Sequence, residues 1–278
     1  PPPRGCDATP HGGAYTCVDY ARGALHLAGR TLSLTLDLSE AGCGCNAAVY
    51  LVAMPQNLSP TRCKDYYCDA NAVCGVACVE IDLVEANRVA FVTTVHVADD
   101  KEGESFGIGH YVSSREKRWT SSRLCSYGPD AQCTIDTNFP FTARFSFSSS
   151  SSAFEYTVAL EQAGRVARLP STVRYLSAPT HGAAASAAAA NAILAASLAA
   201  GMTLVVSYWA GATRQQMAWL DQPCSAAERG EWRCVDEYSE HREWEWTCDR
   251  AEGAAPTCGG GFRVSEVRVE GATAWWVW

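Results

Sequence analysis

The stretch Thr31-Leu32-Ser33-Leu34-Thr35-Leu36-Asp37-Leu38 alternates polar and apolar residues along its whole length. Strand side chains point to opposite faces in turn, so this pattern predicts a β-strand with one face on a core and one on water or ligand. Ala143-Arg144-Phe145-Ser146-Phe147 predicts a similar strand, and the more apolar Ala48-Val49-Tyr50-Leu51-Val52-Ala53 predicts one buried on both faces. Turn sequences such as Ala28-Gly29-Arg30 and Gly128-Pro129-Asp130 separate these stretches. Many short strands with such breaks predict a β-sandwich or barrel.

One segment departs from this pattern. An Ala-rich run over residues 183–200 predicts a surface helix that ends at Gly201, because alanine has the highest helix propensity. The serine run Ser148–Ser152 lies between two strand-like stretches, and we interpret it as a turn. The sequence contains no internal repeat and no clear domain boundary, so we expect a single domain over residues 1–278.

The composition argues against several classes of protein. Lys and Arg number 22 and Asp and Glu number 30, which gives a net charge of −8. Nucleic acid and anionic membranes need a basic face, so neither is expected as the main partner. Hydrophobic residues make up 47% of the chain and charged residues 19%, which excludes a disordered chain. No stretch is long and apolar enough to predict a membrane span.

The sequence contains 14 cysteines, far more than a cytosolic chain of this size usually carries. Their spacings show no repeated CxxC pairs and no histidines arranged for zinc. We therefore predict a disulfide framework in a secreted protein, with no metal and no cofactor. The chain begins at Pro1-Pro2-Pro3-Arg4-Gly5, without a basic and apolar leader, and we interpret it as a mature form whose signal segment is missing.

The most informative stretch for function is Val79-Glu80-Ile81-Asp82-Leu83-Val84-Glu85-Ala86-Asn87. In a strand, Glu80 and Asp82 share a face, whereas Glu85 is an odd number of positions away and falls on the opposite one. A β-bulge uses up one residue and brings Glu85 back to the side of the other two acids. The glutamate Cα atoms then lie about 13 Å apart. Side chains leaning inward could close the carboxyl groups to the ~5–5.5 Å of a retaining glycosidase.

Three acids on one strand face suit retaining glycoside hydrolysis. One ionised carboxylate attacks the anomeric carbon, and a second, protonated carboxyl group gives its proton to the leaving oxygen. Three neighbouring acids cannot all ionise cheaply, so repulsion raises the pKa of at least one, and Asp82 can share a hydrogen bond with the nucleophile. The alternative is a strand whose polar residues only face water, which this arrangement makes less favourable.

The pattern ExDxxE resembles the active-site strand of a glycoside hydrolase clan that contains families 7 and 16. The motif alone fits both families, and the flanking sequence decides for family 7. Asn46–Met54 resembles the family 7 strand with a tyrosine beside the nucleophile, Tyr67–Asn71 resembles its Tyr-Cys-Asp-x-Gln segment, and His96 lies where it has Thr-Pro-His. Gly201–Trp209 and Met217–Asp221 are similar to its Gly-Met-x-Leu-Val-x-Ser-x-Trp and Met-x-Trp-Leu-Asp motifs.

This resemblance implies an all-β fold, a concanavalin-like β-jelly-roll sandwich of two antiparallel sheets. It implies Glu80 as nucleophile, Glu85 as acid/base and Asp82 as the assisting acid. Further residues are implied to bind the sugar chain, with two tryptophans as stacking platforms and an arginine on the product side: Tyr50, Asp69, Asn71, His96, Trp209, Trp219 and Arg229.

The resemblance also implies two disulfide bonds, Cys68–Cys78 and Cys43–Cys234. Proximity in the sequence alone suggests three more pairs, which are Cys6–Cys17, Cys125–Cys133 and Cys248–Cys258.

The implied activity is retaining, endo-acting hydrolysis of β-1,4-glucan, cellulose-type or mixed-linkage, by a secreted monomer. Family 7 domains are longer, and the residues missing here fall between Asp69 and Glu80 and after His96, where that family builds loops over the substrate. Short loops imply an open cleft and internal chain cutting. Two alternatives stay open. One is a catalytically decayed protein with a structural or glycan-binding role, which Val84 in place of a tryptophan also suggests, and the other is family 16-like activity on β-1,3-glucan.

Overall fold

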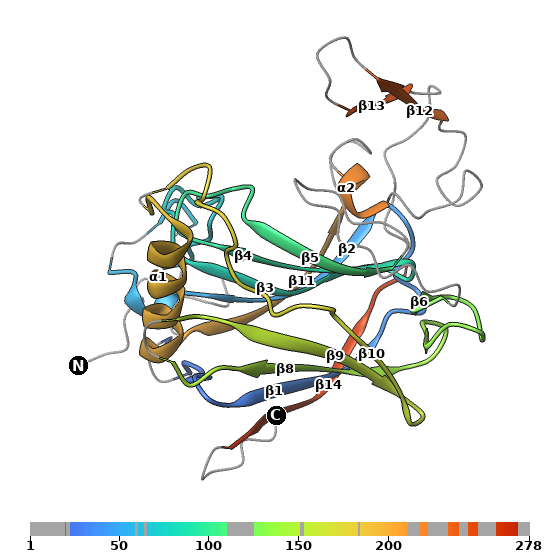
Figure 1. Ribbon diagram of the computed structural model, residues 1–278, viewed down its shortest axis with the longest axis horizontal. Helices are drawn as coiled ribbons and strands as arrows, with labels where there is room; N and C mark the ends of the chain where they lie inside the picture. Colours follow the sequence, from blue (N-terminus) through green and yellow to red (C-terminus); the bar gives the residue numbers. More distant parts are fainter. Residues whose placement is uncertain are drawn as a thin grey trace, which may run out of the picture.

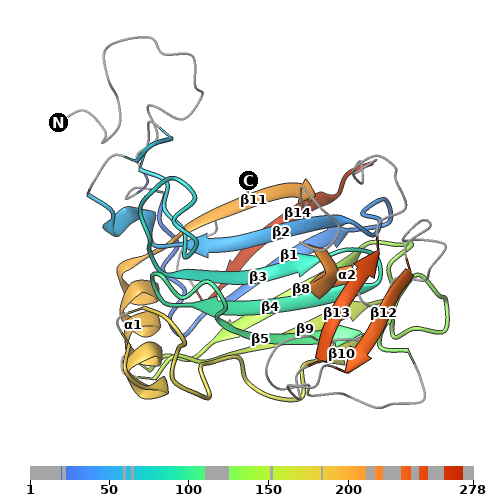
Figure 2. The same ribbon diagram turned by 90° about the horizontal axis from the view of Figure 1, so that it is seen from above.

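The protein is a sandwich of two five-stranded antiparallel sheets that lie face to face (Figures 1 and 2). The computed structural model describes residues 20, 23–58, 61–63, 66–109, 125–150, 153–182, 184–210, 217–221, 233–238, 244–249 and 260–271. The first sheet has the order β10-β9-β8-β1-β14, with strands β10 (Arg165–Arg168), β9 (Tyr156–Gln162), β8 (Phe141–Phe147), β1 (Thr31–Asp37) and β14 (Arg263–Glu270). The second has the order β11-β2-β3-β4-β5, with strands β11 (Thr203–Ala210), β2 (Cys45–Val52), β3 (Glu80–Ala86), β4 (Ala90–His96) and β5 (Glu104–Gly109).

Smaller elements complete the described part of the chain. The short strands β6 (Tyr127–Gly128) and β7 (Ile135–Asp136) pair in parallel, and β12 (Arg233–Tyr238) and β13 (Trp244–Asp249) pair antiparallel. The helical turns are η1 (Met54–Gln56) and α2 (Ala218–Asp221).

The hydrophobic core lies between the two sheets. Leu32, Leu34 and Leu36 of β1 are fully buried, as the alternating sequence predicts. They pack in one cluster with apolar residues of the second sheet such as Leu51 and Ile81. Each fully buried leucine or isoleucine contributes roughly 1.5–3 kcal/mol relative to exposure, so this interface holds the two sheets together. Strand β2 is buried at every position except Tyr50, which agrees with its more apolar sequence.

The Ala-rich helix is α1 (Ala187–Ala200), at one end of the sandwich (Figure 1). It starts four residues later than predicted, because Ser186 is the N-cap and its hydroxyl accepts the N–H of Ala189. It ends at Gly201, as predicted, where φ is 96° and a side chain would be strained. One face is exposed, and the other packs into the core through Ala190, Asn191, Leu194, Ala195 and Leu198. Within the described ranges, no helix is long and apolar enough to cross a membrane.

Three disulfide bonds lie within the described residues, and two of them confirm predicted pairs. Cys68–Cys78 and Cys125–Cys133 form as expected, with Cα atoms 5.6 and 4.4 Å apart. Cys63–Cys74 was not predicted. Cys43 is disulfide-bonded, but the side chain of its expected partner Cys234 lies outside the description, as do Cys6, Cys17, the side chain of Cys248 and Cys258.

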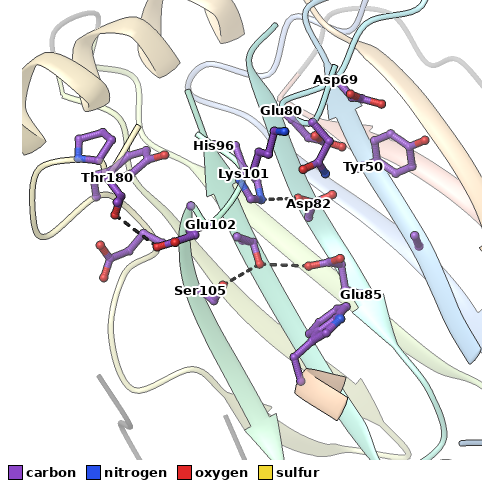
Figure 3. Close-up of a pocket in the computed structure, with 18 of the residues that line it drawn as sticks. Tyr50, Asp69, Glu80, Asp82, Glu85, His96, Lys101, Glu102, Ser105 and Thr180 are labelled. Atoms are coloured by element: carbon purple, nitrogen blue, oxygen red, sulfur yellow. Dashed lines mark hydrogen bonds and ion pairs between the residues drawn. The ribbon is translucent and has the colours of Figure 1, made fainter. Parts of the chain in front are cut away.

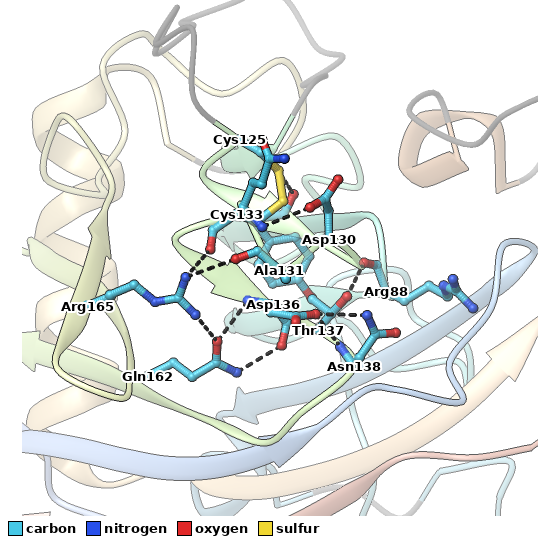
Figure 4. The surroundings of a disulfide bond; sticks show 12 residues. Arg88, Cys125, Asp130, Ala131, Cys133, Asp136, Thr137, Asn138, Gln162 and Arg165 are labelled. Carbon is cyan, nitrogen blue, oxygen red and sulfur yellow. Dashed lines mark hydrogen bonds between the residues drawn. A yellow bond between two sulfur atoms is a disulfide. The ribbon is translucent and has the colours of Figure 1, made fainter.

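The Cys125–Cys133 loop is tied to the first sheet by polar contacts (Figure 4). Arg165 donates from Nη1 to the carbonyl of Cys133 at 2.7 Å. The amide of Gln162 donates to the carbonyl of Asp136 and accepts its N–H, both at 2.8 Å. This loop is therefore braced by β9 and β10, and its residues do not line the cleft described below.

Candidate active site

The β-bulge predicted in β3 is present at Leu83. Against β2, Val84 pairs with Val49 and Asp82 pairs with Tyr50, so Leu83 has no residue opposite it. The pairing of β3 with β4 shifts over the same residues. One extra residue in a strand without a partner is what defines a bulge, and it resets which face the following side chains occupy.

The bulge brings the three acids of β3 together. Glu80, Asp82 and Glu85 all line one cleft on the outer face of the second sheet (Figure 3). The intervening Leu83 and Val84 are fully buried in the core between the sheets. Because of the bulge, β3 directs its apolar side chains into the core and its three carboxyl groups into the cleft.

Two hydroxyl groups, one from β4 of the same sheet and one from β9 of the first sheet, fix the backbone at the bulge. The hydroxyl of Thr93 in β4 donates to the carbonyl of Asp82 at 2.6 Å, because a carbonyl can only accept. Its single hydrogen is then used, so the hydroxyl of Tyr156 in β9 donates to Thr93 Oγ1 at 2.5 Å. All three residues are buried. A hydroxyl chain from the first sheet thus holds the strand that carries the acids.

The cleft has a volume of about 1120 Å³, which is large enough for an extended ligand. All five strands of the second sheet, α2 and three loops contribute to it. Every predicted binding residue within the description lines it, namely Tyr50, Asp69, Asn71, His96, Trp209 and Trp219. Arg229 lies outside the described residues.

Glu80 is held from the loop that precedes β3. The N–H of Ala70 donates to Glu80 Oε2 at 2.9 Å. The adjoining Cys68–Cys78 disulfide and the backbone bond from Cys78 N–H to the Asp69 carbonyl fix this loop. Burial raises the pKa of Glu80 well above its ordinary value, and the negative charge of Asp82 raises it further. The Ala70 N–H acts in the opposite direction, because it favours the ionised carboxylate.

Asp82 contacts His96 on the neighbouring strand. Asp82 Oδ2 lies 3.1 Å from His96 Nε2, and His96 Nδ1 lies 2.7 Å from the carbonyl oxygen of Asp100. Because that carbonyl only accepts, Nδ1 carries a hydrogen. Burial raises the pKa of Asp82 to about 8, and the charge of Asp69 acts in the same direction. The carboxyl group of Asp82 is therefore protonated over much of the range in which an ordinary aspartate is ionised.

Glu85 lies further along the cleft and is half-buried. Its carboxyl group accepts the hydroxyl of Thr94 at 3.1 Å and the amide of Asn46 at 3.3 Å. Ser105 in turn contacts the hydroxyl of Thr94 at 3.0 Å. Burial raises the pKa of Glu85 to about 8, and the charge of Asp82 raises it further. This group can therefore carry a proton at neutral pH.

Aromatic side chains flank the acids. The hydroxyl groups of Tyr50 and Tyr67 lie 2.9 Å apart, and burial raises the pKa of both, so they stay neutral beside Glu80. Trp209 on β11 is 41% exposed, and Trp219 on α2 packs on a small cluster that includes Met217 and Leu220. Exposed indole faces can stack on the apolar faces of pyranose rings.

Sequence reasoning missed one wall of the cleft. The turn around Glu102 is joined to the segment 176–180 by Thr180, whose hydroxyl donates to Glu102 at 3.3 Å, and Ser177 donates to Glu104 at 3.3 Å (Figure 3). Lys101 lies on the same wall. These contacts join residues more than 70 positions apart, and no local pattern signals them. Among the described residues, no group of His, Cys, Asp or Glu side chains is arranged to hold a metal ion.

Comparison with known proteins identifies the relatives of the chain. No family model matches the sequence. The chain is 30% identical over 233 residues to endoglucanase EG-1 of Hypocrea jecorina, an alignment that covers 73% of this chain and 48% of that protein. EG-1 of Trichoderma longibrachiatum gives the same identity and the same coverage. The chain thus spans about half the length of the curated relatives it matches.

Solved structures agree on the fold. An endoglucanase I in complex with cellobiose matches with a TM-score of 0.52 and 23% identity, over 74% of this chain and 63% of that one. A mutant of the endocellulase Cel7B of Humicola insolens matches with a TM-score of 0.51 and 20% identity over the same shares. The fold is therefore the β-jelly-roll sandwich of a class of glycoside hydrolases. Within this class, the chain is a divergent homologue of the family 7 endoglucanases, as its flanking motifs predict.

Proposed function

We propose that the chain is a retaining, endo-acting glycoside hydrolase that cleaves β-1,4-glucan. The observation that carries the proposal is the bulge at Leu83, which puts Glu80, Asp82 and Glu85 on one face of β3 inside one cleft. A retaining hydrolase needs one carboxylate that attacks and one carboxyl group that donates a proton, on the same side of the strand.

In the first step, the carboxylate of Glu80 attacks the anomeric carbon while the bond from that carbon to the leaving oxygen breaks. Glu85 gives its proton to the leaving oxygen, and its pKa of about 8 supports this role at neutral pH. The Ala70 N–H holds Oε2 of Glu80, so we assign the attack to Oε1. The products of this step are a glycosyl ester on Glu80, a free sugar end and an ionised Glu85.

In the second step, Glu85 takes a proton from water, whose oxygen attacks the same anomeric carbon. The ester bond breaks, Glu80 leaves as a carboxylate, and the sugar keeps its original configuration. Asp82 assists both steps, because a protonated Asp82 adds no negative charge beside the nucleophile. Both carboxyl groups are then back in their starting states.

Several observations support glucan as the substrate. The matched relatives are named endoglucanases, and one matched structure holds cellobiose. Trp209 and Trp219 line the cleft with the acids and suit stacking on glucose rings. The disulfide bonds support an oxidising compartment, and we propose that the protein acts outside the cell as a monomer.

The test compares Glu80→Gln with Glu85→Gln on two substrates. On soluble cellulose, both variants should lose nearly all release of reducing ends. On an aryl β-cellobioside, whose leaving group needs no proton, Glu85→Gln should still release the phenol in a first turnover, whereas Glu80→Gln should not.

The control is Glu155→Gln, at a glutamate outside the cleft, which should hydrolyse both substrates like the wild type. A wild-type protein that binds glucan without hydrolysing β-1,4, mixed-linkage or β-1,3 chains would instead support the decayed, glycan-binding alternative. Turnover confined to laminarin would support family 16-like activity on β-1,3-glucan.

A further inference from the structure

His96 is confined on three sides. Its Nε2 faces Asp82, its Nδ1 faces the carbonyl of Asp100, and the residue is only 7% exposed. Gly103 closes the third side, since a Cβ atom there would lie 2.6 Å from both Nδ1 and Cε1 of the ring. The ring therefore has little room to turn, and the backbone around Asp100 decides which ring nitrogen carries the hydrogen.

That backbone is held by a buried tyrosine. The hydroxyl of Tyr175 donates to Asp100 Oδ2 at 2.6 Å and accepts the N–H of Val97 at 3.0 Å. Asp100 is 1% exposed, and Tyr175 is 3% exposed. One hydroxyl group thus bonds both ends of the turn from Val97 to Asp100, whose carbonyl receives the hydrogen of His96 Nδ1.

Helix α1 holds the tyrosine. The side chain of Asn191 donates from Nδ2 to the carbonyl of Tyr175 and accepts the N–H of Tyr175 at Oδ1, both at 2.9 Å. An asparagine that is 9% exposed in an otherwise Ala- and Leu-rich helix is costly unless such bonds satisfy it. Asn191 therefore has a specific partner, and it links the helix to the turn behind His96.

We propose that Asn191, Tyr175 and Asp100 form a positioning relay that keeps the hydrogen of His96 on Nδ1 and directs Nε2 at Asp82. The relay residues contact one another, and the carbonyl of Asp100 contacts the ring. Their proposed role is to position His96 and not to react with substrate. With Nδ1 protonated, a single proton lies between Nε2 and Asp82 Oδ2. When the ring is neutral, that proton belongs to Asp82, which then adds no charge beside Glu80.

The consequence for catalysis rests on the proposed function. Asp82 contacts the ring, and Glu80 and Glu85 of the same strand interact with it electrostatically. The charged groups of the turn and strand that follow β4 and line the same cleft are Lys101, Glu102 and Glu104. The carboxylate of Asp100 is bonded to Tyr175. If the hydrogen moves to Nε2, the ring donates it to Asp82 Oδ2, which favours the ionised carboxylate of Asp82 and release of its proton to solvent. The added charge raises the pKa of Glu80, so the acidic limb of the pH profile of kcat/KM should move to higher pH.

The experiment reads the ring nitrogens of His96 by NMR in protein labelled with ¹⁵N-histidine. The chain has six histidines, and the resonances of His96 are those that disappear in His96→Gln. In the wild type, Nδ1 should carry a hydrogen at every pH from about 5 to 8. In Tyr175→Phe and Asp100→Ala, a measurable Nε2–H form should appear, and the acidic limb should rise by about half a pH unit or more.

Two controls separate positioning from general stability. Asp100→Asn keeps an acceptor for the Tyr175 hydroxyl and should restore the wild-type ring signals. Tyr127→Phe removes another buried hydroxyl bond, to the carbonyl of Asn87, and should leave His96 unchanged. An Nε2–H ring in the wild type, or unchanged ring signals in Tyr175→Phe and Asp100→Ala, would overturn the relay. The ring measurement needs no turnover, so it decides the relay even if the protein hydrolyses no glucan.

Discussion

At the scale of single residues, the main feature of the site is that its three carboxyl groups hold their protons to higher pH than free carboxyl groups do. Burial raises the pKa of Glu80, Asp82 and Glu85 together, and each charge that does form raises the pKa of a neighbour. The Ala70 N–H opposes this effect at Glu80. The Thr94 hydroxyl and the Asn46 amide oppose it at Glu85. The proposed mechanism requires an ionised Glu80 beside a protonated Glu85.

Raised carboxyl pKa values predict how stability depends on pH. Between the ordinary value near pH 4.5 and the folded value of about 8, folded Glu85 holds a proton that the unfolded chain has lost. The free energy of unfolding should therefore fall as pH rises through this window. Glu85→Gln removes the cost of ionising this buried carboxyl group. In urea unfolding at about pH 8, the free energy of unfolding of the variant should therefore exceed that of the wild type by roughly 1–3 kcal/mol.

At pH 4, where Glu85 is protonated in both states, the advantage of Glu85→Gln should vanish. Glu155→Gln, at a glutamate outside the cleft, serves as the matched control and should show no gain at either pH. A variant that is equally or less stable than the wild type at about pH 8 would contradict the raised pKa of Glu85.

At the scale of elements, the bulge of β3 depends on the hydroxyl chain from Tyr156 through Thr93 to the Asp82 carbonyl. Thr93→Val keeps the shape of the side chain but leaves that carbonyl and the Tyr156 hydroxyl without their shared partner. We expect a loss of about 1–3 kcal/mol in unfolding free energy and a fall in kcat. Thr142→Val, at a partly exposed position of β8, is the control. A fall in stability without any change in kcat would show that these hydroxyl bonds hold the two sheets together but do not position the acids.

Two disulfide bonds allow a second comparison of elements. Removing Cys68–Cys78 or Cys125–Cys133 as an Ala pair should cost roughly 2–4 kcal/mol in either case, since both close short loops. Only the first bond anchors the loop whose Ala70 N–H reaches Glu80. Cys68→Ala/Cys78→Ala should therefore lower kcat, whereas Cys125→Ala/Cys133→Ala should leave kcat near the wild-type value. Equal effects on kcat would contradict the proposal that this loop positions Glu80.

The elements also show what sequence can predict. Strand alternation in β1 and the odd spacing of Glu85 from Asp82 predict the sandwich and the bulge, because both follow from local periodicity. The alanine run predicts a helix from residue 183, but α1 starts at Ala187, because Ser186 is the N-cap and its hydroxyl accepts the N–H of Ala189. Contacts such as that of Asn191 with Tyr175 form between segments that are distant in the sequence, and no local sequence pattern predicts them.

At the scale of the whole molecule, the acids lie midway across a cleft to which all five strands of one sheet contribute. Figure 2 shows this sheet spanning the length of the sandwich, with α1 at one end. A cleft that crosses five strands, with the three acids along its floor, suits the proposed binding of an internal stretch of polysaccharide. The net charge of the chain, −8, does not hinder binding of a neutral glucan.

This arrangement predicts the cutting mode. During digestion of soluble carboxymethylcellulose, viscosity should drop steeply while few reducing ends have formed, because internal cuts shorten chains fastest. Trp209→Ala should weaken binding and raise KM several-fold, with a smaller effect on kcat, since stacking on one aromatic ring is worth about 0.5–1.5 kcal/mol. Slow viscosity loss with cellobiose as the main early product would contradict internal cutting.

The most direct measurement is covalent trapping of the sugar on the nucleophile. A 2-deoxy-2-fluoro-β-cellobioside with an activated leaving group slows the second step more than the first, so the glycosyl ester accumulates. Mass spectrometry of the digested protein should find the added sugar on the peptide that contains Glu80 and locate it on that side chain. A label on Glu85 or elsewhere, or active enzyme that never acquires a label, would contradict the assignment of Glu80 as the attacking carboxylate.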